Sequence, residues 1–250
     1  MNLKEEKMMT VNGKEITLYY PDGTIIPSIE EFIDFYSKCY YVSNNIEVEK
    51  TIEDILKTGI KSSKELFRVL AWKLGKINMK KSKGTAFVYY EEMTEENMKL
   101  RLYKKEHIMV KSDIEDLYEK IKSYSGKCKT DKKAKDFLND IIVFTDEKSW
   151  GDYFYPVYMI TLLYFVSNGR YPIVDSFSYV ALDAICNHIE YGTRKTYPGL
   201  IGKNNDKFKE IVTKGTYKKY KEWLKEIFGE KAQSREVDQA LWVYGKLFKK

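Results

Sequence analysis

Residues 150–189 read WGDYFYPVYMITLLYFVSNGRYPIVDSFSYVALDAICNHI and contain the longest apolar run of the chain. Within them, residues 153–166 are almost entirely aromatic or aliphatic, with no charged side chain. The sequence Ser-Asn-Gly-Arg at 167–170 then provides the glycine that often follows the end of a helix. We therefore expect a buried helix that ends near this glycine, with the other helices packed around it.

The link after this helix is predicted to be short and extended. Pro172 disfavours the helical conformation of Tyr171, the residue before it. Asp175 follows three residues later, and an aspartate at the start of a helix can accept hydrogen bonds from backbone N–H groups of the first turn. The centre of the chain is thus predicted to be a buried helix, an extended link and a second helix capped by Asp175.

Signals for helices recur along most of the chain. Ser28, Ser62 or Ser63, and Ser234 each precede apolar residues that recur at helical spacing, as expected of N-cap residues. Turn sequences at Asn12-Gly13 and 21–23 interrupt a weak alternation of apolar residues, which favours a small N-terminal hairpin or arm. The expected fold is mainly α: a multi-helix globular bundle with a small N-terminal hairpin or arm.

Two less regular stretches and one hydrophilic stretch bear on the organisation of the chain. Residues 77–110 fit either a short strand or a mobile loop, and residues 206–228 form one long amphipathic segment. Residues 124–134 are hydrophilic and rich in Lys, as is typical of an exposed connection. We expect an N-terminal helical subdomain with a short β arm at 1–123 and a C-terminal helical subdomain at 135–250, or one continuous domain.

Composition limits the class of protein. The formal net charge of +6 is compatible with a polyanionic partner but does not require one. Three widely spaced cysteines disfavour a disulfide framework, which indicates a reducing, cytoplasmic compartment. The first ten residues lack the apolar region of a secretory signal, and residues 153–166 are shorter than the ~20 residues of a spanning helix. No membrane association is expected.

The usual sequence signatures of catalysis and of cofactor binding are missing. The chain has no phosphate-binding loop, no glycine-rich dinucleotide motif, no HExxH, no CxxC and no GxSxG sequence. The histidines are His107 and His188, and Cys186 is two residues from His188, a spacing at which side chains on a helix do not converge. We expect no cofactor and no metal site.

One segment, PIVDSFSYVAL at 172–182, resembles a family. A Pro-x-x-Asp at the start of a helix, after an apolar helix and a turn with glycine, resembles the helix-hairpin-helix DNA glycosylase superfamily, in particular its 8-oxoguanine glycosylase-like members. The resemblance covers residues 150–190. It implies a DNA-binding protein of glycosylase-like fold, either a base-excising enzyme or an inactive relative.

The resemblance also implies roles for particular residues. Asp175 would be the catalytic acid that stabilises the positive charge developing on the sugar as the base leaves. Val157 or Tyr158 occupies the place of the Schiff-base lysine of bifunctional members, so the enzyme would be a monofunctional N-glycosylase without lyase activity. The remaining roles are phosphate binding by Arg170, Lys195 and Lys203, and a base pocket walled by Trp150 and Tyr153.

Each of these residues also has a structural interpretation. Asp175 can be a helix cap alone, and Trp150 and Tyr153 can belong to the core. The absence of a complete catalytic set favours an alternative function: a non-catalytic, all-helical interaction protein, such as a bacterial accessory or defence-associated subunit with a protein partner. A small-molecule enzyme is a third alternative that no motif supports.

Overall fold

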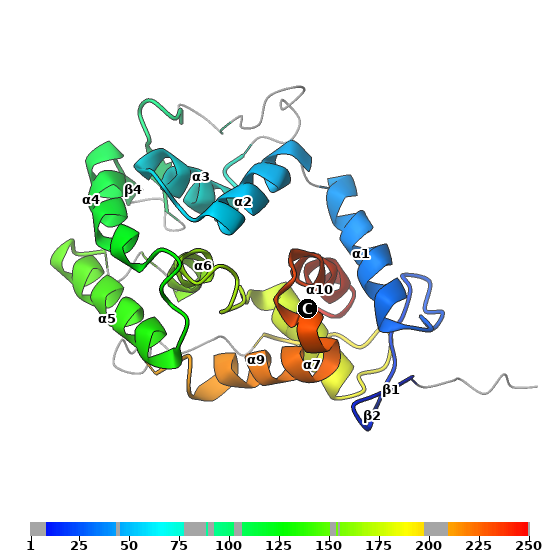
Figure 1. Cartoon of the computed structure of the whole chain (residues 1–250). Coiled ribbons are helices and arrows are strands. Elements are labelled where there is room, and N and C mark those ends of the chain that lie inside the picture. The colour runs from blue at the N-terminus through cyan, green and yellow to red at the C-terminus, as the bar shows by residue number, and fades with distance from the viewer. Residues whose placement is uncertain are drawn as a thin grey trace, which may run out of the picture. The chain divides into compact units, whose positions relative to one another are not determined.

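The computed structural model describes residues 9–43, 46–77, 89, 93–102, 107–150, 154, 156–197 and 210–249 (Figure 1). This part of the chain contains nine α-helices and two small antiparallel sheets of two strands each, which confirms the prediction of a mainly α protein. None of its helices combines the length and the apolar composition needed to cross a bilayer.

The chain divides into two compact units, each built from segments that are separate in the sequence. Unit 1 comprises residues 1–43, 174–200 and 215–250, and unit 2 comprises residues 44–173 and 201–214. The predicted subdomains at 1–123 and 135–250 stay a prediction. The stretch predicted as their connection, 124–134, lies within unit 2, and its last four residues already belong to a helix.

The described residues of unit 1 form four α-helices and the predicted N-terminal hairpin. The hairpin turns at Asn12 and Gly13, both with positive φ, as expected of this dipeptide between paired strands. Its elements are β1 (Met9–Val11), β2 (Lys14–Ile16), α1 (Ile29–Ser43), α7 (Ser176–Cys186), α9 (Gly215–Phe228), the 3₁₀ helix η2 (Gly229–Gln233) and α10 (Arg235–Phe248).

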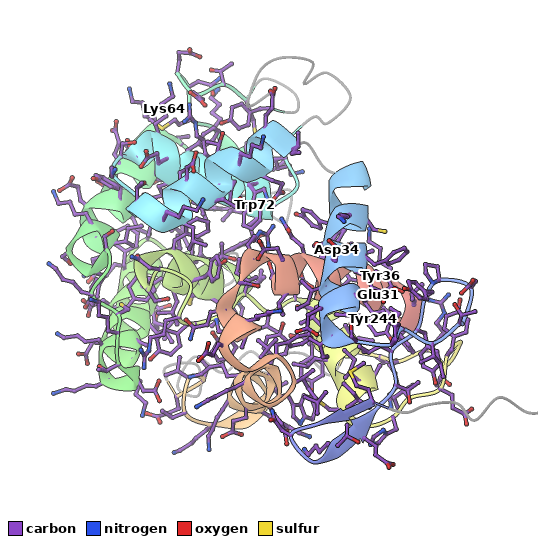
Figure 2. The ribbon with its side chains drawn as sticks, turned by 45° about the vertical axis from the view of Figure 1, so that its right-hand side comes forward. Glu31, Asp34, Tyr36, Lys64, Trp72 and Tyr244 are labelled. Atoms are coloured by element: carbon purple, nitrogen blue, oxygen red, sulfur yellow. The ribbon has the colours of Figure 1, made fainter. Side chains whose placement is uncertain are left out.

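The core of unit 1 forms around α10, which packs against both α1 and α7 (Figure 1). Against α1, the rings of Tyr36 and Tyr244 lie 5.1 Å apart and both side chains are buried (Figure 2). Against α7, Gly245 lets the two backbones approach closely, because a Cβ atom there would lie 2.1 Å from the carbonyl oxygen of Phe177. The small residue thus decides how near the C-terminal half of α10 comes to the first turn of α7.

Unit 2 is organised around α6, which has no exposed face. Every residue from Tyr158 to Val166 is buried, as predicted for the central apolar run. Positive φ at Asn168 and Gly169 ends the helix where the sequence predicts. The elements are α2 (Ile46–Thr58), α3 (Ser63–Lys73), β3 (Leu100–Arg101), β4 (Ile108–Met109), α4 (Lys111–Ile121), the 3₁₀ helix η1 (Lys122–Tyr124), α5 (Asp131–Glu147) and α6 (Pro156–Val166).

The predicted serine caps are confirmed. The prediction of one long amphipathic segment at 206–228 is wrong in part, because its first described residues are not helical. The hydroxyls of Ser28, Ser62 and Ser234 each accept a hydrogen bond from the backbone N–H three residues later. Residues 210–214 form turns, and α9 begins only at Gly215, whose φ of +72° is incompatible with continuing a right-handed helix. Residues 206–209 lie outside the described residues.

Candidate nucleic-acid interface

Asp175 caps α7, as the sequence predicts. Its carboxylate oxygen Oδ1 accepts hydrogen bonds from the backbone N–H groups of Phe177, at 2.9 Å, and Ser178, at 3.1 Å. The backbone N–H of Asp175 in turn donates to the Ser178 hydroxyl at 3.0 Å, which completes a reciprocal capping box. The half-buried carboxylate therefore has a full structural role, and a catalytic role for it stays a prediction.

Tyrosine rings lie on the α9 side of Asp175. Tyr179 of α7 is stacked with Tyr220 of α9 at 6.3 Å and lies 5.3 Å from Tyr197. Burial raises the pKa of the Tyr197 phenol, and the negative charge of Asp175 adds to the effect. Within unit 1 the Asp175 carboxylate thus lies beside closely packed phenol rings.

A group of cations surrounds the C-terminus of α10, and we call Arg194, Lys195, Lys246 and Lys249 the α10 cation cluster. The Arg194 guanidinium donates to the carbonyl oxygens of Lys246, at 3.0 Å, and Lys249, at 3.1 Å. The backbone N–H of Lys195 donates to the carbonyl oxygen of Phe248 at 2.6 Å. These bonds satisfy carbonyl groups that the helix end leaves open, and they hold residues 194–195 against α10.

Lys246 of α10 and Lys249, the residue after its end, lie over aromatic rings. The Lys246 Nζ atom is 3.7 Å from the centre of the Trp242 ring, four residues earlier on the same helix face. The Lys249 Nζ atom is 4.2 Å from the centre of the Phe177 ring and donates to the Ser176 hydroxyl at 2.6 Å. The cluster therefore extends from the end of α10 to the first turn of α7, next to the Asp175 cap.

The cluster carries little compensating negative charge. In the described part of the chain, no carboxylate forms an ion pair with Arg194, Lys246 or Lys249, and Lys195 lies 4.0 Å from Asp183 at the distance limit of such a pair. Burial lowers the pKa of the Lys246 ammonium, the direction expected when a cation loses water without gaining a carboxylate. The arrangement can attract an anion.

The predicted site residues lie in different parts of the fold. Asp175 and Lys195 belong to unit 1, whereas Arg170 is exposed in unit 2, in the turn after α6.

Trp150 is also in unit 2, where it is 2% exposed and its ring centre lies 5.4 Å from that of Phe144. That packing agrees with the core interpretation of Trp150, and its role in a base pocket stays a prediction. Lys203 and Tyr153 lie outside the described residues.

The chain has no match among models of known protein families, curated protein sequences or solved structures. Across the described ranges, no group of three or more His, Cys, Asp or Glu side chains is arranged to hold a metal ion. The function must therefore be inferred from the residues themselves.

Most members of the α10 cation cluster do not follow from the sequence motifs. Trp242 and Lys246 have a helical i, i+4 spacing that could have indicated their contact. No local signal connects Arg194 with α10 or Lys249 with Ser176, because these partners are 52 and 73 residues apart. Only the packing of α7 against α10 brings them together.

Proposed function

We propose that the chain binds DNA through the α10 cation cluster. The observation that carries the proposal is the convergence of Arg194, Lys246 and Lys249, from two separate segments, without a carboxylate partner in the described residues. A phosphate backbone supplies closely spaced negative charges, and each lysine or arginine that meets a phosphate releases a condensed counterion. The resemblance of residues 150–190 to DNA glycosylases supports the same polyanion.

The local structure favours phosphate contacts over a purely solvated surface. Arg194 is held by two hydrogen bonds from one Nη atom, so its position is defined while other guanidinium N–H groups stay available as donors. The Lys246 and Lys249 side chains lie along aromatic rings, which limits the side-chain entropy that binding removes. A charged surface that is already ordered binds a polyanion at lower entropic cost than free lysines do.

The proposal is tested by titrating a labelled 20-base-pair duplex at several salt concentrations. Replacing both Lys246 and Lys249 by Gln should weaken binding and lower the salt slope by about 2, since each phosphate contact contributes about 0.9. The matched control replaces Lys38 and Lys57 by Gln, which removes the same charge from side chains that are 73% and 72% exposed. The control should keep most of the affinity and the slope.

Two results would overturn the proposal. One is an absence of salt-sensitive duplex binding by the natural chain. The other is an equal loss in the two double variants, which would show a dependence on net charge alone. Absence of binding together with a light-scattering mass above that of one chain would favour the alternative, a non-catalytic interaction protein.

A further inference from the structure

Two aromatic rings lie within the α10 cation cluster, and neither is fully buried. Trp242 and Phe177 are both half-buried, and their ring centres are 5.7 Å apart with nearly perpendicular planes, at 69°. Tyr40 supports Trp242 from α1 at 5.4 Å, again nearly perpendicular, at 77°. Two packed helices thus hold the Trp242 ring in one orientation.

The cover on each of these rings is a single lysine side chain. Lys246 lies over Trp242 and Lys249 lies over Phe177, and a lysine is a point charge on a flexible four-carbon stem. A phosphate carries a full negative charge, whereas a ring attracts an ammonium only through its quadrupole, so an incoming phosphate can draw the ammonium away from the ring. The face of the ring is then free to accept a planar group.

We propose that the preferred ligand of the α10 cation cluster is single-stranded DNA, with an unpaired base stacked on Trp242 and the adjacent phosphates bound by Lys246, Lys249 and Arg194. This inference rests on the proposed function and specifies its ligand. In a duplex, the faces of the bases are covered by their neighbours, so a duplex can use the cations but not the rings. A single strand uses both, as in other proteins that combine a basic groove with aromatic stacking.

The geometry suits stacking that does not depend on base identity. The flanking donors are lysine ammonium groups, the Arg194 guanidinium and the Ser176 hydroxyl, and contacts from such donors to phosphates carry no sequence information. Every base has a π-face, so an aromatic platform accepts all four. We therefore expect little sequence preference among unpaired strands.

The decisive experiment uses the natural chain and three labelled ligands of 20 nucleotides or base pairs: oligo-dT, a strand of abasic spacers and a duplex. Oligo-dT and the abasic strand carry the same backbone charge and differ in the bases alone. Oligo-dT should bind about tenfold more tightly than the abasic strand, because stacking of one base is typically worth a factor of roughly five to one hundred. Equal affinity for these two strands would overturn the inference.

A variant locates the stacking. Trp242→Leu should abolish the advantage of oligo-dT over the abasic strand, so that the ratio of the two affinities falls to about one, whereas Tyr191→Leu, a change at a 40% exposed ring of unit 1, should preserve that ratio. Retention of the advantage in Trp242→Leu would overturn the assignment. If that variant does not fold by circular dichroism, the comparison in the natural chain still decides. Salt-sensitive binding of all three ligands with equal affinity would refute the stacking alone, and absence of binding would refute the proposed function as well.

Discussion

The backbone of Gly245 in α10 lies so close to Phe177 in α7 that a Cβ atom on the glycine would be 2.1 Å from the Phe177 carbonyl oxygen and 2.6 Å from its carbonyl carbon. The obstructing atoms belong to a helix backbone and cannot move without separating the helices. This contact therefore sets the spacing between α10 and the first turn of α7, where Lys249 of the α10 cation cluster contacts Ser176.

The first prediction concerns Gly245→Ala. In an open helix this change stabilises by roughly 0.5–1 kcal/mol, because alanine is the better helix former. Here the clash should reverse the sign, and we expect a loss of at least about 2 kcal/mol in the free energy of unfolding, a typical cost of overpacking. Urea denaturation followed by circular dichroism measures it.

Lys225→Ala, at an exposed position of α9, is the matched helix control and should change stability by less than about 0.5 kcal/mol. Because Gly245 also positions the cluster, its variant should bind DNA more weakly even at temperatures where it remains folded. A Gly245→Ala protein as stable as the natural chain would show that α7 and α10 are not packed this closely.

The second prediction separates the two roles of Asp175. Asp175→Ala removes the acceptor for the Phe177 and Ser178 N–H groups and should cost about 1 kcal/mol of stability, whereas Asp175→Asn keeps a capping oxygen and should stay close to the natural chain. Thermal melting of the three proteins measures this. A larger loss for Asn than for Ala would contradict the capping geometry.

The same pair of variants tests the catalytic role. If Asp175 stabilises a sugar cation, Asp175→Asn should abolish base release in an assay for abasic sites, although it remains folded. If Asp175 is a cap alone, the Asn variant and the natural chain should give the same result in that assay. The amide keeps the hydrogen bond and removes the charge, so stability and chemistry can be read separately.

Local signals explain how much of the fold could be predicted. Ser28, Ser62, Ser234 and Asp175 each bond to a backbone group two or three residues away, so the sequence itself contains both partners. The start of α9 does not follow from the spacing of apolar residues, because that spacing suggests one segment that continues through Gly215. Ile211 and Val212 before it are buried, but they lie in turns. Burial alone does not distinguish a helix from a packed turn.

The candidate site could be predicted only in small part, and the reason is physical. The family resemblance implies phosphate binding by Lys195, but two of its neighbours in the α10 cation cluster, Lys246 and Lys249, come from the end of the chain. Gly245 is the residue that brings Lys249 to Ser176, and a glycine within a helix has no sequence signal that identifies the backbone it will contact. Tertiary contacts of this kind need an alignment or a structure.

The third prediction concerns the attachment of the N-terminal segment to α1. The Tyr36 hydroxyl donates to the carbonyl oxygen of Tyr19 at 2.6 Å, and the Tyr36 side chain is 1% exposed. Tyr36→Phe should cost about 1 kcal/mol, because the partly buried Tyr19 carbonyl loses this donor and the buried Tyr36 side chain limits access of a replacing water. Tyr118→Phe is the control, since Tyr118 makes a bond of the same length to Lys61 at an exposed position.

Chemical denaturation of both variants gives the comparison. The loss for Tyr36→Phe should exceed that for Tyr118→Phe, and equal losses would mean that water reaches the Tyr19 carbonyl. Hydrogen exchange should also show faster exchange at residues 18–26 in Tyr36→Phe, because the backbone bond between Ile26 and Leu18 lies in the same segment.

The last prediction concerns the acid sensitivity of unit 2. Glu95 accepts a hydrogen bond from Arg68 at 2.7 Å and pairs with Lys64 at 2.5 Å, which fastens the segment at 93–102 to α3. Burial of the Glu95 carboxyl acts to raise its pKa, but the hydrogen bonds from Arg68 and Lys64 outweigh it and hold the pKa below its ordinary value. Proton uptake by Glu95 is therefore less favourable in the folded state than in the unfolded state.

A lowered pKa in the folded state means that the stabilisation is complete above the ordinary glutamate pKa, near 4.3, and is lost as the pH falls through the lower folded value. Glu95→Gln should therefore cost about 1–2 kcal/mol at pH 7 and much less at pH 3, measured by urea denaturation at each pH. Asp34→Asn, which breaks an exposed pair with Lys38, should change stability by less than about 0.5 kcal/mol at either pH. A cost for Glu95→Gln that is the same at pH 3 and pH 7 would show that the charge of Glu95 does not hold this segment, and that the side chain acts by packing alone.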